Sequence, residues 1–212
     1  MANQHLNLVL MGNSIAYHFM EGMKHITDFN GYDHLVFLLA LCAVYDFSQW
    51  KRVLILVTAF TIGHSLTLIS AGLDIVVIPS HVAEFLIPCT ILLTALFNLR
   101  ETKEPRNIRP GKLRPGGKLK YFVTLLFGMI HGFGFSNYFR MIRVDEGDSI
   151  LTELLFFNIG VEAGQILIVI AILILATIMM GVFKFRQRAW ILFASGIAAG
   201  ISLILIQDTW LF

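Results

Sequence analysis

Charged residues are scarce in this sequence: they make up 14% of its 212 residues, while 57% are hydrophobic. Soluble domains carry about 25% charged residues, so this composition excludes an ordinary soluble globular protein. Only two cysteines occur, Cys42 and Cys89, and no C-x-x-C pair is present, which argues against a disulfide framework or a thiolate metal site. The net charge is only +2, so nucleic acid is not indicated as a partner.

Lysine and arginine are missing from the first 23 residues, and the apolar run from Leu6 to Met11 is short. No small-residue cleavage site follows it, so we expect no cleaved signal peptide.

Several apolar stretches of about 20 residues are long enough to cross about 30 Å of hydrocarbon as helices. The sequence therefore predicts an all-α, polytopic integral membrane bundle, with a single transmembrane domain over residues 1–212. The six predicted spans are Asp33 to Phe47, Trp50 to Leu73, Ser80 to Leu99, Tyr121 to Phe139, Ile150 to Phe183 and Ala189 to Gln207.

The distribution of basic residues predicts the orientation of these spans. The linker 100–120 holds eight of the sixteen lysines and arginines, so by the positive-inside rule we expect it in the cytoplasm. Alternation from this linker also places Lys51, Arg52 and the basic residues at 184–188 inside. Both termini and the acidic turn at 145–148 are then expected outside.

The segment before the first predicted span has apolar residues at helical spacing from Ser14 to Ile26. We expect residues 1–32 to form an amphipathic segment on the outer face. A seventh span over Leu6 to Met23 is the alternative, although Glu21 and His18 make it less favourable.

Ionisable residues within the predicted spans are the candidates for function, because each costs at least about 2.5 to 3.5 kcal/mol to place in lipid. The candidates are Asp33, His34, His64, Glu84, His131 and Glu162, with His25 just before the first span. We expect His5, His18 and His81 to be ordinary interfacial or exterior residues.

Counting along the helices places Asp33, His34, His64, His131 and Glu162 in the outer half of the membrane, although they belong to four different spans. Imidazoles and carboxylates suit zinc, nickel, cobalt, copper or iron. The sequence therefore predicts a divalent metal site within the bundle.

Polar and small residues support this site. Asn158, Glu162 and Gln165 lie on one helix face, which must point inward. Ser65 follows His64 directly. Pairs of glycines four residues apart permit close helix approach and occur at 160 and 164, 128 and 132, and 196 and 200.

Structural explanations exist for several of these residues. Asp33 could equally accept hydrogen bonds from backbone N–H groups at a helix start. Glu84 lies near the N-terminus of its span, where a carboxylate is favoured by the helix dipole. His64 and His131 could serve as hydrogen-bonding core residues.

Four strings in this sequence resemble the HupE/UreJ family. They are Lys24-His25 with Asp33 to Leu38, Thr58 to Leu66, Phe127 to Phe135, and Phe157 to Gln165, and they occur in the family's order over the chain from about Phe19 onward. The resemblance implies a nickel or cobalt permease of the bacterial inner membrane. It also implies that His25, Asp33 and His34 match the family's metal-recognition motif, although seven residues separate His25 from Asp33, a longer gap than is usual in the family.

Three functions remain open from the sequence. In a permease, His25, Asp33 and His34 would capture the ion at the outer mouth, and His64, His131 and Glu162 would hold it at the midplane. In an intramembrane metal hydrolase acting on a lipid or lipoprotein, zinc would activate water, Glu162 would be the general base, and Ser65 or Asn158 would stabilise the oxyanion. In a haem protein, His64 and His131 would be the axial ligands. The bilayer and a metal ion are the expected partners, and assembly into a homo-oligomer stays open.

Overall fold

The computed structural model describes residues 2–28, 31–73, 75–76, 78–101, 117–142 and 150–210. Every regular element in these residues is helical, which confirms the predicted all-α architecture. The elements are α1 (Ala2–Thr27), α2 (Asp33–Cys42), the 3-10 turn η1 (Phe47–Gln49), α3 (Trp50–Gly72), α4 (Ser80–Glu101), α5 (Gly117–Ile142), α6 (Ile150–Gly181) and α7 (Gln187–Asp208).

Five segments of the described chain are long and apolar enough to cross a membrane, which makes this a multi-pass membrane protein. They are Phe47–Gly72, Ser80–Arg100, Lys118–Ser136, Leu151–Gly181 and Gln187–Asp208. They correspond to the second to sixth predicted spans. The sidedness of the bundle and of its termini stays a prediction, and residues 102–116 of the basic linker and the acidic turn at 145–148 lie outside the described residues.

The first predicted span is wrong in its extent. Helix α2 begins at Asp33 as expected but ends at Cys42, so at about 1.5 Å per residue it reaches only about 15 Å, or half of the hydrocarbon. Its end is stabilised by Asn98 of α4, whose amide donates to the Ala40 carbonyl oxygen (2.8 Å) and to the Ser195 hydroxyl (3.0 Å). These bonds satisfy polar groups that would otherwise be costly to bury.

Helix α1 runs unbroken to Thr27, and its C-terminal part packs against α6. Gly22 lies so close to α6 that an added Cβ would overlap the Phe157 carbonyl oxygen, and a Cβ at Gly160 would overlap the Phe19 carbonyl oxygen. Because Phe157 and Gly160 belong to a candidate span, this part of α1 lies inside the bundle. The end of α1 and the short α2 together take the place of the first predicted span.

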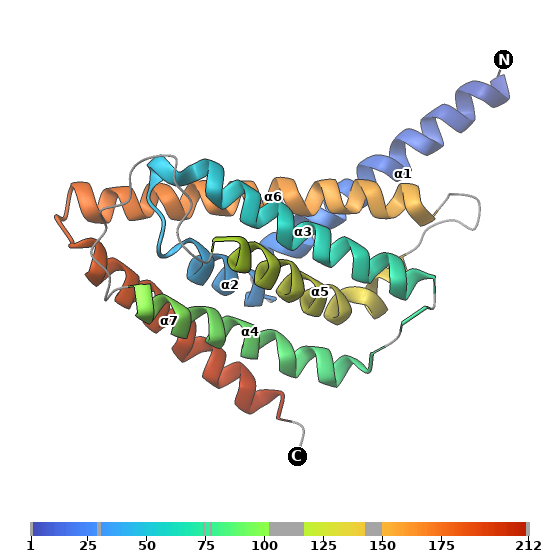
Figure 1. Ribbon diagram of the computed structural model, residues 1–212. Coiled ribbons are helices and arrows are strands. Elements are labelled where there is room, and N and C mark those ends of the chain that lie inside the picture. The colour runs from blue at the N-terminus through green and yellow to red at the C-terminus, as the bar shows by residue number, and fades with distance from the viewer. Residues whose placement is uncertain are drawn as a thin grey trace.

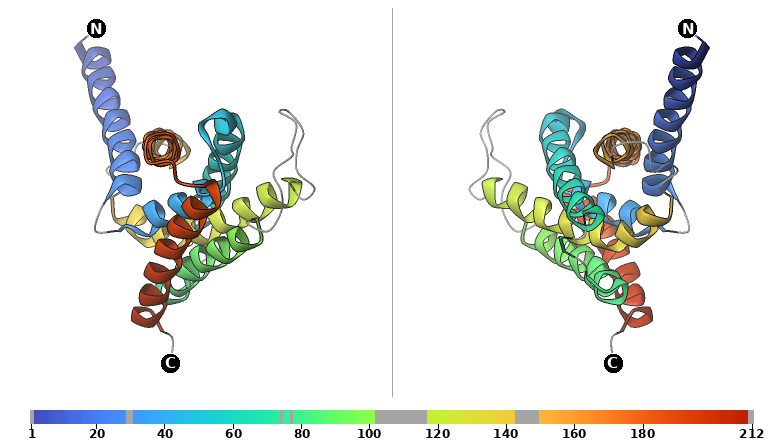
Figure 2. Two further views of the ribbon diagram at one scale, coloured as in Figure 1. Left: turned by 90° about the vertical axis from the view of Figure 1, so that its left-hand side faces the viewer. Right: turned by 90° about the vertical axis from the view of Figure 1, so that its right-hand side faces the viewer.

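Figure 1 shows α6 along one side of the bundle and the crossed pair of α4 and α7 on the opposite side, with α2 between them. Helix α2 contacts α1, α4, α6 and α7, so this short helix lies at the centre of the bundle. The views along the bundle in Figure 2 show that the first turns of α1 project away from the other helices.

Helices α3 and α5 pack through a second close approach. A Cβ at Gly63 would overlap the Leu125 carbonyl oxygen, and a Cβ at Gly128 would overlap the Phe60 carbonyl oxygen. Such contacts bring the two backbones, and therefore the side chains at their crossing, unusually close.

The structure also corrects one predicted glycine contact and gives the length of α6. The predicted glycine approach at Gly196 and Gly200 is wrong within the described chain, because a Cβ at either residue would meet no atom within 4 Å. Helix α6 is continuous and extends about 48 Å, beyond the thickness of the hydrocarbon.

We predict that Gly22→Ala destabilises the protein by about 1 to 3 kcal/mol, because a methyl group cannot fit against the α6 backbone without separating the helices. The measurement is the thermal unfolding midpoint in detergent. Gly200→Ala is the matched control, since its new methyl group meets no neighbour and alanine favours helix. Equal midpoints for the two variants would contradict the close α1–α6 packing.

Candidate metal centre

Four histidine side chains from four helices converge at the centre of the bundle. They are His25 of α1, His34 of α2, His64 of α3 and His131 of α5. The His34 ring centroid lies 4.7 Å from that of His25, 6.4 Å from that of His64 and 5.1 Å from that of His131. One ligand nitrogen from each of His25, His34 and His64 lies within 4.8 Å of the others. We call these four residues the histidine cluster.

The cluster lies at mid-height of the bundle. His64 is fourteen residues after Trp50 and eight before Gly72, and His131 is fourteen after Gly117 and eleven before Ile142. His25 and His34 reach this depth because the first crossing is interrupted between α1 and α2. The discontinuity also explains how seven intervening residues are accommodated between His25 and Asp33, because the two belong to separate helices.

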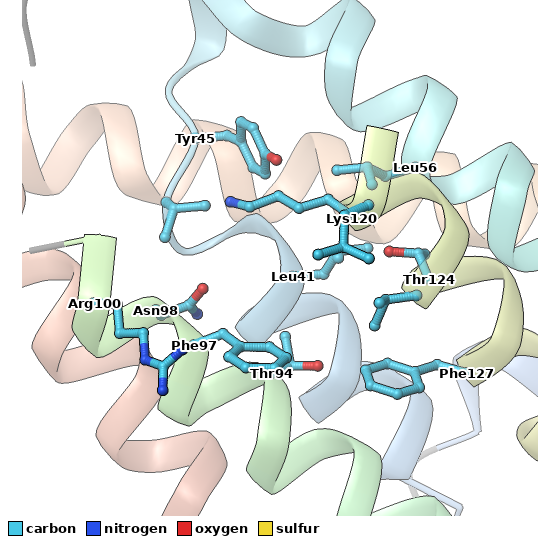
Figure 3. Close-up of a pocket in the computed structure, with 13 residues that line it drawn as sticks. Leu41, Tyr45, Leu56, Thr94, Phe97, Asn98, Arg100, Lys120, Thr124 and Phe127 are labelled. Carbon is cyan, nitrogen blue, oxygen red and sulfur yellow. The ribbon is translucent and has the colours of Figure 1, made fainter. Parts of the chain in front are cut away.

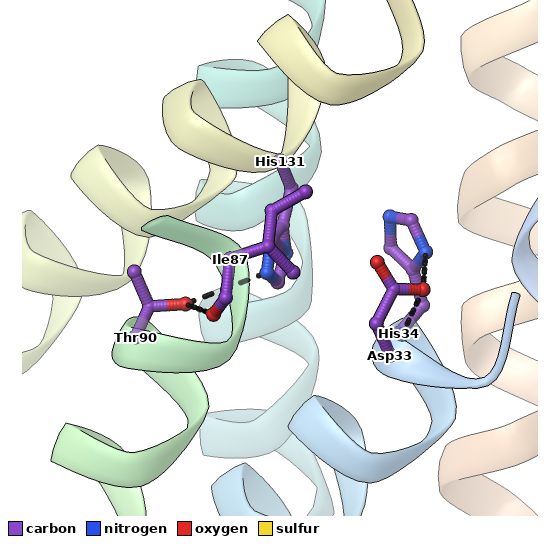
Figure 4. A network of polar contacts seen from close by, with 5 residues as sticks. All are labelled: Asp33, His34, Ile87, Thr90 and His131. Carbon is purple, nitrogen blue, oxygen red and sulfur yellow. Dashed lines mark hydrogen bonds and ion pairs between the residues drawn. The ribbon is translucent and has the colours of Figure 1, made fainter. Parts of the chain in front are cut away.

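Asp33 orients the His34 ring. Its Oδ1 accepts hydrogen bonds from the His34 backbone N–H (2.9 Å) and from ring Nδ1 (3.1 Å), as Figure 4 shows. A carboxylate can only accept, so Nδ1 carries the proton and Nε2 retains its lone pair. Nε2 is buried without a hydrogen-bond partner. Asp33 thus combines the helix-start role with the carboxylate–histidine pairing that is typical of metal ligands.

Thr90 of α4 fixes the His131 ring in a similar way, and sequence reasoning did not single it out. Its hydroxyl donates to the Ile87 carbonyl oxygen (2.7 Å) and lies 3.4 Å from His131 Nε2 (Figure 4). Because its one proton is directed to Ile87, the hydroxyl can only accept from Nε2. Nδ1 of His131, which is buried and has no hydrogen-bond partner, then holds the lone pair.

The cluster therefore presents several unsatisfied ring nitrogens in a buried space. Nε2 of His25, Nε2 of His34, both nitrogens of His64 and Nδ1 of His131 are buried without hydrogen-bond partners. Such polar atoms are costly to bury unless something binds them. Neutral imidazoles are favoured ligands of zinc, copper, nickel and iron, so these residues fit a divalent transition metal.

An aromatic layer closes one side of the cluster. Phe37, Phe60 and Phe127 each lie about one helical turn from His34, His64 and His131, all toward the bundle end that contains Cys42, Trp50 and Gly117. The Phe37 ring lies 5.0 Å from those of Phe60 and His131 and 6.2 Å from that of Phe127. We call these three phenylalanines the lower aromatic layer.

A second pair of rings covers the opposite side. Phe135 lies one turn beyond His131 and stacks on Phe157 of α6, with centroids 4.9 Å apart and planes 16° from parallel. The Phe135 centroid is also 3.8 Å from that of His25. We call Phe135 and Phe157 the upper aromatic pair. Aromatic rings thus lie on two sides of the cluster, while His25 and Asp33 are partly exposed.

Beyond the lower aromatic layer lies a cavity of about 370 Å³ (Figure 3). Its wall includes Phe127 together with the polar side chains of Thr94, Asn98 and Thr124. Lys120 and Arg100 lie where α5 begins and α4 ends, with their charges over the rings of Tyr45 and Phe97 (5.9 Å each). The sequence alone did not predict this cavity.

The remaining predicted site residues lie apart from the histidine cluster in their contacts. Glu162 accepts a hydrogen bond from the Thr58 hydroxyl (2.7 Å), and Gln165 accepts one from the Thr61 hydroxyl (2.8 Å). Ser65 donates to the Thr61 carbonyl oxygen (2.7 Å). Glu162, Ser65 and Asn158 line a separate hollow of about 250 Å³ between α3 and α6.

The structure also places the side chains of Glu84, His81 and His18 outside the histidine cluster. Glu84 and His81 are exposed on α4, as expected for residues near a helix start. His18 was expected at the interface but is fully buried between α1 and α6, because its helix enters the bundle. The side chain of His5 lies outside the described residues.

Comparison with known families identifies the chain over almost its whole length. A family model described as HupE / UreJ protein matches residues 3–212. No curated protein and no solved structure matches the chain. All four cluster histidines, His25, His34, His64 and His131, lie within the four sequence strings. The chain belongs to the HupE/UreJ family.

Proposed function

We propose that this protein is a divalent transition-metal permease of the bacterial inner membrane, with the histidine cluster as its central substrate site. The observation that carries the proposal is the convergence of His25, His34 and His64, whose ligand nitrogens lie within 4.8 Å of one another at mid-height of the bundle. Buried ionisable residues at this depth mark substrate pathways in membrane proteins. Membership of a family associated with nickel and cobalt makes these ions the proposed cargo.

The surroundings of the cluster suit a transported ion. Asp33 supplies one negative charge next to His34, which offsets part of the charge of a divalent cation. Imidazole ligands bind firmly but exchange, whereas a thiolate would hold the ion more tightly; Cys42 and Cys89 are absent from the cluster. The site therefore binds a transition metal in preference to magnesium or calcium, which require oxygen ligands.

The two aromatic barriers support alternating access. The lower aromatic layer and the upper aromatic pair lie between the cluster and the two ends of the bundle. Displacing one barrier at a time would open the site to one side only. The interruption between α1 and α2 gives two short elements that can move separately, as in other transporters with discontinuous helices.

The cavity beyond the lower aromatic layer provides the inner part of the route that we propose for the ion. The cavity places the hydroxyls of Thr94 and Thr124 and the amide of Asn98 around one space. A hydrated cavity lowers the cost of moving a cation through this part of the bundle. The positive charges of Lys120 and Arg100 disfavour retention of the ion there, so it is released rather than stored.

The contacts give less support to the two alternative functions, a metal hydrolase and a haem protein. For a hydrolase, the proposed base Glu162 faces Thr58 and a separate hollow rather than joining the three grouped histidines. For a haem protein, a macrocycle would have to lie between His64 and His131. The Phe60 ring lies 6.3 Å and 5.0 Å from those two rings, and His34 packs beside both, which fills that space.

We predict that His64→Ala weakens nickel or cobalt binding by at least about 100-fold, since loss of a ligand costs no less than loss of an outer-shell partner. Isothermal titration of detergent-purified protein measures the affinity. His81→Ala is the matched control, because His81 is exposed on α4 and should leave the affinity unchanged. The same affinity in both variants would rule out the cluster as the binding site.

Asp33→Asn should weaken metal binding by about 10- to 100-fold, the usual effect of altering a carboxylate that orients a ligand. Asparagine retains an oxygen that can accept from His34, so the fold is preserved while the charge is lost. Competition with a chelator of known affinity gives the dissociation constant. Glu84→Gln, which removes an exposed carboxylate, serves as the control, and an effect of equal size there would indicate a general electrostatic change.

Transport itself is tested by uptake into proteoliposomes that contain a metal indicator. We expect saturable uptake of cobalt or nickel by the native protein and by His81→Ala, and uptake at the level of empty liposomes for His64→Ala. Tight binding without uptake, under metal gradients in both directions, would contradict the permease and leave the metal in a static role.

A further inference from the structure

A second buried pair of metal-ligating side chains lies outside the histidine cluster. His18 of α1 and Glu153 of α6 face each other with 3.9 Å between Nε2 and Oε1, and each side chain is only 1% exposed. Both nitrogens of the His18 ring are buried without a hydrogen-bond partner. Neither residue has a role in the site described above.

The pair lies on the far side of the upper aromatic pair from the cluster. His18 precedes His25 by seven residues, which is two turns and about 10 Å along the same face of α1. Glu153 precedes Phe157 by one turn and lies in the first turn of α6. The order along the bundle is therefore the His18–Glu153 pair, then Phe135 and Phe157, then the histidine cluster.

The separation of the two side chains suits a shared ion better than a direct contact. A hydrogen bond between nitrogen and oxygen is about 2.7 to 3.2 Å long, so at 3.9 Å these two atoms do not form one. Two ligand atoms that each lie about 2.1 Å from one ion are at most about 4.2 Å apart. A transition-metal ion can therefore fit between Nε2 and Oε1 with little movement of either side chain.

We propose that His18 and Glu153 form a second, weaker divalent metal site, which takes the ion before it passes the upper aromatic pair to the histidine cluster. The metal-binding part stands on the pair alone, and the order of transfer rests on the proposed permease function. Two protein ligands, completed by water, hold an ion less tightly than three or four imidazoles. The weaker site at the end of α6 and the stronger one at mid-height give the ion a favourable inward step.

The test is a cobalt titration of detergent-purified protein followed by visible absorption. The native protein should show two classes of site, and His18→Gln and Glu153→Gln should each remove the weaker class. In a His64→Ala background the weaker class should remain, and adding His18→Gln should abolish it. Tyr17→Phe, which alters the neighbouring ring against His18, is the matched control and should retain both classes.

Uptake kinetics separate a binding site from a purely structural ion pair. In proteoliposomes, His18→Gln should raise KM for cobalt on the order of tenfold while the maximal rate is retained, because the cluster still binds and releases the ion. A lower thermal midpoint with both classes of site intact would overturn the proposal in favour of a structural pair. So would native binding by both variants.

These results are distinguishable from failure of the proposed function. If His64→Ala left all binding intact and His18→Gln abolished it, the pair would be the metal site and the cluster proposal would fail. If two classes of site were present but uptake were absent, the second site would stand and the permease would not.

Discussion

The cost of burying imidazole nitrogens without hydrogen-bond partners is the constraint on which the rest of this structure depends. His25, His34, His64 and His131 all place at least one such nitrogen in the interior of a membrane bundle. Each unpaired polar atom there costs free energy that packing must offset until a ligand binds. The glycine contacts of α3 with α5 and of α1 with α6 bring the four helices close enough for these rings to meet. The interruption between α1 and α2 delivers two of the rings to mid-height.

The sequence predicted the parts of this arrangement that depend on length and spacing. Apolar stretches gave five of the crossings, and counting residues at 1.5 Å each placed His64 and His131 at similar depths. The shared depth of His34 could not be predicted with the same certainty, because the sequence favoured a full span from Asp33 to Phe47. That prediction failed because an apolar run does not reveal where its helix ends. Asn98, which is distant in sequence, stabilises the end of α2, and such tertiary hydrogen bonds carry no local signal.

The lack of a local signal for tertiary contacts also explains which polar residues were predicted least accurately. Glu162 is the most conspicuous carboxylate in the apolar sequence, yet its partner is Thr58 on α3. Thr90 is unremarkable in the sequence, because threonines are common in membrane helices and usually bond to their own backbone. Its importance comes from its position opposite His131 on another helix. His18 was assigned to the interface because the start of α1 is polar, whereas a glycine contact four residues later brings it inside. Ionisable residues mark a site in sequence, but only helix packing decides which of them share it.

The layered arrangement around the histidine cluster bears on the choice between the proposed transport and catalysis. A hydrolase needs one permanent opening through which a large substrate and water reach the metal, and its metal stays in place. In this structure phenylalanines lie on both sides of the cluster, with polar groups beyond them: His18 and Glu153 on one side, and the cavity of Thr94, Asn98 and Thr124 on the other. Polar sites separated by layers of apolar side chains suit a small ion that moves from one site to the next. Each barrier lies about one helical turn from the cluster histidines. The arrangement of the barriers, more than the identity of the ligands, therefore supports the proposed transport.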